Sequence, residues 1–137
     1  MRTMELGFAG TPLRRQLVDA VLRGEKTATA GLLVDYEREG EPLPSVGDRS
    51  VLIDDADVGV AVVEVTDVRV LRVADCELAF ARDEGEGFES VAAWREAHER
   101  FWRGYADEIR AYLGDPSWDI TDDTLFVAER FRVVERL

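Results

Sequence analysis

The chain has 137 residues, of which 46% are hydrophobic and 34% charged, and its formal net charge is −12. This length and composition predict one globular domain, residues 1–137, with a single core and little disorder. The negative charge argues against tight binding along many phosphates, because such binding needs basic side chains to displace counterions. A small uncharged ligand, such as a nucleoside, fits this charge balance better than RNA does, and the oligomeric state is left open.

Cysteine usage and hydropathy predict a cytoplasmic protein. Cys76 is the single cysteine, so it has no partner for an internal disulfide, and we expect it to fill an apolar gap. No apolar run reaches the roughly 20 residues that span a membrane. The first eight residues, MRTMELGF, lack the apolar stretch of a secretory signal. A reducing compartment and no membrane partner are the resulting expectations.

The predicted elements begin with a helix, which Thr11 caps and Pro12 opens. Gly24 ends this helix, and residues 27–34 have the composition of a strand. Residues 36–48 contain two prolines and two glycines, which predicts a loop that could fold over a cleft. The short interval after Gly24 is therefore a turn from helix to strand.

The second half of the chain alternates between strands and helices. Residues 50–53 and 58–70 are predicted strands, joined by the acidic turn 54–57. The remaining elements are two helices and a last strand, predicted at residues 74–82, 90–113 and 124–134, with Ser90 as a helix cap. This order predicts an α+β fold, a small mixed or antiparallel β-barrel with helices packed around it.

Lys26 is the only lysine in the chain, beside 16 arginines. A lysine is a compact ammonium whose pKa falls readily on burial, so it can act as a base or a nucleophile. It lies in the pattern Gly-x-Lys-x-x-Thr, residues 24–29. Strand residues three apart face opposite sides, so Lys26 and Thr29 converge only if Lys26 belongs to the turn, which Gly24 permits. A solvated lysine beside an ordinary strand threonine is the alternative interpretation.

The linker of residues 83–87, Asp-Glu-Gly-Glu-Gly, joins two predicted helices through three carboxylates and two glycines. Glycines there permit unusual backbone angles and the close approach of a ligand to the main chain. A carboxylate of this linker turned toward the single lysine would orient it and help to set its pKa. The alternative is a flexible acidic linker without a site.

Other residue types that can carry chemistry are few. His98 is the only histidine, four residues after Trp94 and thus on the same helix face, and it is a catalyst, a structural group or a hydrogen-bonding group of the cleft. Tryptophans that stack on a base or fill the core are Trp94, Trp102 and Trp118. An acidic hairpin turn explains Asp54, Asp55 and Asp57 without a cation. We predict no metal and no cofactor.

Several segments together resemble the ASCH domain, and they occur in the order typical of that family: residues 24–29, 44–48, 60–66, 83–87, 94–98 and 101–102. The resemblance extends from Phe8 to the last strand. It implies a β-barrel similar to the RNA-binding PUA domain. It also implies a cleft beside the helix that precedes the Gly-x-Lys-x-x-Thr turn.

The functions of this family are mixed: many members are described as RNA binders, some cleave RNA, and a short bacterial branch hydrolyses the amide of N4-acetylcytidine. Carried over by motif, the catalytic set of that branch would be Lys26, Thr29 and Glu84, with Glu86 as the rival carboxylate. Residues 94–98 have no counterpart in the short branch. Substrate contacts on this hypothesis are Gly24, Thr27, Glu86, Trp94 and His98.

In the corresponding mechanism Lys26 removes the proton of the Thr29 hydroxyl, Thr29 attacks an acyl amide, and Glu84 orients the lysine. Direct attack by an activated water is equally compatible with the sequence. The alternatives to an amidohydrolase are an RNA-binding module or ribonuclease and, third, a small-ligand-sensing domain without catalysis. The expected partner is accordingly a nucleoside-like small molecule or RNA.

Overall fold

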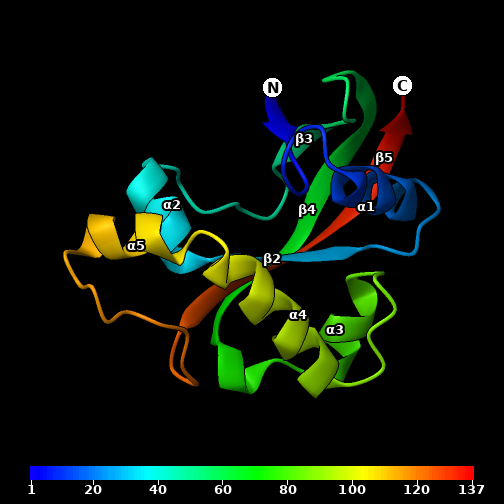
Figure 1. The fold of residues 1–137 in the computed structure, drawn as a ribbon. Coiled ribbons are helices and arrows are strands. Elements are labelled where there is room, and N and C mark those ends of the chain that lie inside the picture. The colour runs from blue at the N-terminus through cyan, green and yellow to red at the C-terminus, as the bar shows by residue number, and fades with distance from the viewer.

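The computed structural model describes residues 1–137, and five of its segments form one mixed sheet in the order β1-β3-β4-β5-β2 (Figure 1). The strands are β1 Arg2–Met4, β2 Ala28–Leu32, β3 Arg49–Ile53, β4 Gly59–Arg72 and β5 Leu125–Arg136. β1 pairs with β3 in parallel, and the other neighbouring strands are antiparallel. The predicted α+β class is confirmed. The sheet is barrel-like but open, since the edge strands β1 and β2 are not paired with each other.

Five helices surround the sheet: α1 Pro12–Leu22, α2 Leu33–Glu39, α3 Leu78–Asp83, α4 Val91–Arg103 and α5 Ala106–Leu113. Both predicted caps are confirmed, because the Thr11 side chain accepts from the Arg14 N–H and the Ser90 side chain from the Ala93 N–H. None of the helices combines the length and the hydropathy that crossing a bilayer requires.

The sequence prediction was wrong at two helices. The predicted loop 36–48 begins inside α2, which ends where Gly40 adopts a left-handed conformation with φ of 66°. The predicted helix 90–113 is two helices, because Gly104 favours helix poorly and Tyr105 leaves the helical region. The break turns the Tyr105 hydroxyl toward Asp35 of α2, to which it donates a hydrogen bond. A tertiary contact therefore accompanies the break in the helix.

Two smaller differences concern short elements. The predicted helix 74–82 is a 3₁₀ turn, Val73–Asp75, followed by α3. β1 was not predicted, because three residues are too few to display an alternating pattern. It lies at the edge of the sheet, with Thr3 opposite Val51 of β3.

Two hydrophobic clusters share strand β5. Phe126 and Ala128 belong to a cluster formed with α3, α4 and α5, whereas Phe131 belongs to a second cluster formed with α1. Residues that alternate along a strand point to opposite faces, so β5 lies between the two clusters. Irregular pairing between β4 and β5, at Val62/Val63 and Val65/Asp67, accompanies this arrangement.

The cluster beside α4 is rich in aromatic side chains. Trp94 and Trp102 are 0% and 1% exposed, and the ring centroids of Trp94 and Phe126 lie 5.2 Å apart. Both tryptophans of α4 are thus part of the core. Cys76 also lies in this cluster, as expected, and burial raises the pKa of its thiol to about 12.

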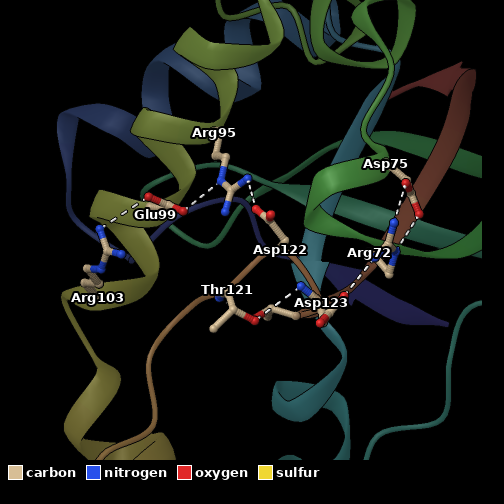
Figure 2. A network of polar contacts seen from close by, with 9 residues as sticks. Arg72, Asp75, Arg95, Glu99, Arg103, Thr121, Asp122 and Asp123 are labelled. Atoms are coloured by element: carbon tan, nitrogen blue, oxygen red, sulfur yellow. Dashed lines mark hydrogen bonds and ion pairs between the residues drawn. The ribbon is translucent and has the colours of Figure 1, made fainter.

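A network of ion pairs fastens the segment before β5 to its surroundings (Figure 2). Arg95 of α4 contacts Glu99 at 2.9 Å and Asp122 at 2.6 Å. At the end of β4, Arg72 contacts Asp123 at 2.8 Å. Exposed ion pairs each contribute little to stability, so this network adds only weakly to the packing of α4 through its buried tryptophans.

The cluster beside α4 predicts the cost of a truncation in β5. Phe126→Ala should lower the free energy of unfolding by about 3–5 kcal/mol, because it leaves a cavity in a fully buried site. Leu125→Ala is the matched control on the exposed side of the same strand and should change stability by less than about 0.5 kcal/mol. Urea denaturation followed by circular dichroism measures both. Equal losses would contradict this assignment of the core.

Candidate functional site

A cavity of about 490 Å³ opens between the N-terminal segment, β2, α2, the linker after α3, and helices α4 and α5. This volume suits a small organic ligand. One part of the cavity is lined by charged and hydroxyl-bearing side chains, which we call the polar cluster: Lys26, Thr29, Glu84, Glu86 and His98. The polar cluster contains the three residues predicted to be catalytic, and they come from the turn, β2 and the linker.

The turn after α1 brings Lys26 and Thr29 to the same cavity. Gly24 has a φ of 78°, which suits glycine, and the Lys26 N–H donates to the Ala20 carbonyl at 3.1 Å. Because β2 begins only at Ala28, Lys26 belongs to the turn and is free of the strand alternation. Its side chain and that of Thr29 therefore both line the cavity.

The acidic linker is tied to this turn by its backbone. The Thr27 N–H donates to the Asp83 carbonyl at 2.7 Å. Gly85 has a φ of 71°, and a Cβ at this position would lie 2.6 Å from both the Glu25 oxygen and the Lys26 nitrogen. The sequence suggested that a linker glycine admits a ligand to the main chain. The Gly85 contact has another role, because it lets the turn and the linker pack together.

Lys26 is held by four oxygens. Its Nζ donates to the Ala28 carbonyl at 2.8 Å and to the Glu84 carbonyl at 3.2 Å. The carboxylate oxygens of Glu84 and Glu86 lie 3.7 and 4.0 Å from the same Nζ. The side chain is 2% exposed, so these carbonyl and carboxylate oxygens, rather than water, surround the nitrogen. This geometry favours a fixed cation over the base suggested by the sequence.

Glu84 connects the linker to α4. Its Oε2 accepts hydrogen bonds from the Trp94 indole N–H and from His98 Nε2, the latter at 3.0 Å. Burial raises the pKa of Glu84, but the hydrogen bond and charge of His98, the charge of Lys26 and the indole hydrogen bond outweigh it and hold the pKa below its ordinary value. Glu84 is therefore ionised at neutral pH.

His98 donates from both ring nitrogens. Nδ1 lies 2.8 Å from the Trp94 carbonyl, which can only accept, and Nε2 faces the Glu84 carboxylate. Burial lowers the pKa of His98, but the hydrogen bond and charge of Glu84 dominate and raise it above its ordinary value. The imidazole also stacks on Trp94, with centroids 4.5 Å apart. Of the roles left open by the sequence, this geometry fits a fixed structural cation in the cavity wall.

Glu86 is the least constrained charged member of the polar cluster. Its side chain is 25% exposed, and burial raises its pKa despite the opposing charge of Lys26. Ligand atoms of Glu84, Glu86 and His98 lie within 4.8 Å of one another, a spacing compatible with a metal ion. The ammonium and the imidazolium already balance both carboxylates, which disfavours an added cation.

The predicted substrate contacts divide into two groups. Glu86 and His98 line the main cavity, whereas Gly24, Thr27 and Trp94 do not. Gly24 and Thr27 lie on a second cavity of about 320 Å³, between the end of α1 and β5. Trp94 is buried in the core and contacts the polar cluster through its indole N–H, its carbonyl and its ring, which stacks on His98.

Sequence reasoning missed Glu129, the cross-strand neighbour of Thr29. Directly opposed side chains in an antiparallel pair lie on the same face of the sheet. Burial, with the charge of Asp48, raises the pKa of Glu129 to about 7, while Lys26 opposes the rise. No local pattern marks this residue, because its proximity to Thr29 depends on the pairing of two strand residues that are 100 positions apart.

Gly85→Ala should separate the turn from the linker. The new Cβ would meet backbone atoms at 2.6 Å, so we expect a loss of about 3 kcal/mol or more from overpacking and backbone strain together. Gly87→Ala is a matched control, since Gly87 also has a positive φ but nothing lies within 4 Å of its added Cβ. Thermal unfolding of both variants tests the contact. If Gly87→Ala lowers stability as much as Gly85→Ala does, the proposed role of the Gly85 contact is wrong.

His98→Phe should change the pH dependence of stability. The raised pKa of His98 means that its ion pair stabilises the native state fully below about pH 6.5 and that this contribution fades as pH rises through the higher folded pKa. The variant should be less stable than the wild type by up to about 3 kcal/mol at pH 6, because buried Glu84 loses a partner. Denaturant unfolding from pH 6 to 9 should show that the difference in unfolding free energy between wild type and variant decreases. A difference that stays constant would show that His98 is not an imidazolium in the native state.

Comparison with known proteins identifies relatives of the same fold. The structure resembles the ASCH domain from Lactobacillus crispatus JV V101, with a TM-score of 0.82, 30% identity, and coverage of 98% of this chain and 80% of that one. Protein EF3133 from Enterococcus faecalis V583 gives a TM-score of 0.83 at 26% identity, covering 99% of this chain and 77% of that one. These likenesses confirm the α+β, PUA-like fold.

A more distant likeness, to hypothetical protein PH0355, has a TM-score of 0.57 at 16% identity, covers 89% of this chain and 94% of that one, and concerns the fold alone. No protein curated for its function matches the sequence at a significant level. The sequence profile of the ASCH domain matches residues 6–135, which is nearly the whole chain. This chain therefore belongs to the ASCH domain family.

Proposed function

We propose that this ASCH protein hydrolyses the amide of a modified nucleoside, such as N4-acetylcytidine, in the main cavity. One observation carries the proposal: buried Lys26 lies between two linker carboxylates, in the wall that also presents the Thr29 hydroxyl. The group combines a nucleophile, a fixed cation and a carboxylate of raised pKa. These are the parts that acyl transfer requires.

The contacts of each side chain suggest its role. In this proposal the ammonium of Lys26 stabilises negative charge on the acyl oxygen, and Glu84, which contacts both Lys26 and His98, keeps that ammonium and the imidazolium in place. Glu86 is the proton carrier, because its pKa is raised and its side chain remains partly exposed to the cavity. Glu84 suits this second role poorly, since its carboxylate is already occupied by donors.

In the proposed reaction the Thr29 oxygen forms a bond to the acyl carbon while Glu86 accepts the hydroxyl proton. The carbon–nitrogen bond then breaks, and Glu86 returns the proton to the departing amine, which leaves as cytidine. Water hydrolyses the resulting ester of Thr29 and releases acetate. The direct alternative uses water as the first nucleophile, with the same proton carrier.

Charge favours this proposal over RNA binding. The chain has a formal net charge of −12, and the only lysine is paired with Glu84 and Glu86 rather than free to contact phosphates. The concentration of ionisable groups with shifted pKa in one cavity favours catalysis over ligand sensing alone.

Release of cytidine from N4-acetylcytidine, followed by chromatography, tests the proposal. Lys26→Ala and Thr29→Ala should each lower kcat/KM by roughly 10²–10³-fold, the effect expected when a charge-stabilising group or a nucleophile is removed. Arg23→Ala, an exposed cation next to the same turn, is the control and should retain activity. Circular dichroism should show that each variant is folded.

The pH profile identifies the proton carrier. Glu86 acts as a base only when ionised, so kcat/KM should rise with pH through its raised pKa. This limb should disappear in Glu86→Gln. Activity that survives Thr29→Ala but not Glu86→Gln would select the water route.

If the wild type releases no cytidine, two other functions remain. Salt-sensitive RNA binding would indicate an RNA-binding module, and nucleoside binding without turnover would indicate a sensing domain.

A further inference from the structure

Five aromatic residues line the cavity, and three of them, Phe8, Phe101 and Tyr105, contact one another and form what we call the aromatic rim. Phe8 and Phe101 stack with centroids 5.4 Å apart and an interplanar angle of 28°. Tyr105 meets both rings edge-on, at 6.4 and 5.8 Å. Phe8 is 57% exposed and Phe101 36%, so these rings retain apolar surface that a flat ligand can cover.

The aromatic rim lies next to the polar cluster along α4. Phe101 lies one helical turn after His98 on α4, and Tyr105 begins the next helix. Phe8 comes from the N-terminal segment, which is held by Arg14 through donation to the Leu6 and Gly7 carbonyls at 3.1 Å each. The rim and the polar cluster thus line one cavity, so a planar ring and an attached amide of the same ligand can contact both.

Carboxylates surround the remaining part of the cavity, which we call the acidic mouth: Glu5, Asp35, Glu39 and Glu108. Arg38 is the single cation among them. Its guanidinium contacts Asp35 at 2.9 Å and Glu108 at 3.7 Å, and it lies 5.7 Å from the centre of the Tyr105 ring. The other cations of the cavity, Lys26 and His98, are paired with Glu84. No lining cation is left without a carboxylate partner.

We propose that the aromatic rim binds the planar base of a neutral nucleoside and that the acidic mouth excludes the corresponding 5′-phosphate. The identity of the base rests on the proposed function, whereas the selection by charge follows from the lining residues. A ribose offers hydroxyl donors to the mouth carboxylates. A phosphate would instead place two negative charges beside an excess of carboxylates, and like charges brought together at a binding surface are strongly unfavourable.

The same argument extends to polymers. Recognition of phosphates in proteins relies on arginine, lysine or backbone N–H donors. At the acidic mouth the only such side chain, Arg38, would have to give up Asp35 or Glu108 to bind a phosphate. The cavity is thus suited to free nucleosides released by degradation of modified RNA, and a phosphatase or nucleotidase reaction must precede it.

Calorimetry with two ligands tests this inference. N4-acetylcytidine and its 5′-monophosphate are titrated into the Thr29→Ala protein, which limits turnover, at low ionic strength. The nucleoside should bind at least about tenfold more tightly than the monophosphate. In a double variant with Glu39→Gln and Glu108→Gln the ratio of the two dissociation constants should decrease several-fold, mainly because the monophosphate binds more tightly. Glu89 is an exposed carboxylate outside the cavity, so the control Glu89→Gln should leave this ratio of affinities unchanged.

Phe101→Ala examines the aromatic rim separately. This substitution should lower the affinity for both ligands by a similar factor, about tenfold, because stacking of the base is independent of the phosphate. Tyr112→Ala, an exposed aromatic of α5 outside the cavity, is the control and should have no effect.

The outcomes separate this inference from the proposed function. Preference for the nucleoside in binding, together with a wild type that releases no cytidine, would support the inference and reject amide hydrolysis. Hydrolysis of both compounds with equal kcat/KM, or equal affinity for them, would overturn the inference and leave the hydrolytic function intact. Failure of both ligands to bind would overturn it as well.

Discussion

The site depends on one buried carboxylate, that of Glu84. Three groups converge on it: the ammonium of the turn after α1, and the indole and imidazole of α4. A buried anion without these partners would be costly, and so would the two cations without the anion. The contacts of Glu84 therefore join the turn, the linker and α4, in addition to apolar packing, at the wall of the cavity.

The charge pattern of the cavity follows from the same requirement. Each cation that lines the cavity is matched by carboxylates of the fold, at the polar cluster through Glu84 and Glu86 and at the acidic mouth through Asp35 and Glu108. Such pairing leaves little electrostatic attraction for an anionic ligand. The PUA-like fold is thus compatible with ligands very different from RNA, as expected when function depends on the site rather than on the architecture.

The parts of the fold that the sequence predicted are those governed by local chemistry. Thr11 and Ser90 mark the starts of α1 and α4 because capping involves only adjacent residues. The grouping of Lys26, Thr29 and a linker carboxylate came from the family motif, with the turn at Gly24 as its physical condition. What could not be predicted arises from long-range contacts. The double protonation of His98 requires knowledge of both of its partners, and the position of Glu129 requires the strand register.

Strand β5 has a wider consequence for the behaviour of the domain. One of its faces carries Phe126 and the other Phe131, so the two hydrophobic clusters are joined by a single backbone segment. Unfolding of one cluster would therefore remove packing contacts from the strand on which the other cluster is built. A chain with two clusters is therefore expected to melt in one cooperative transition, without a half-folded form that keeps only one of them.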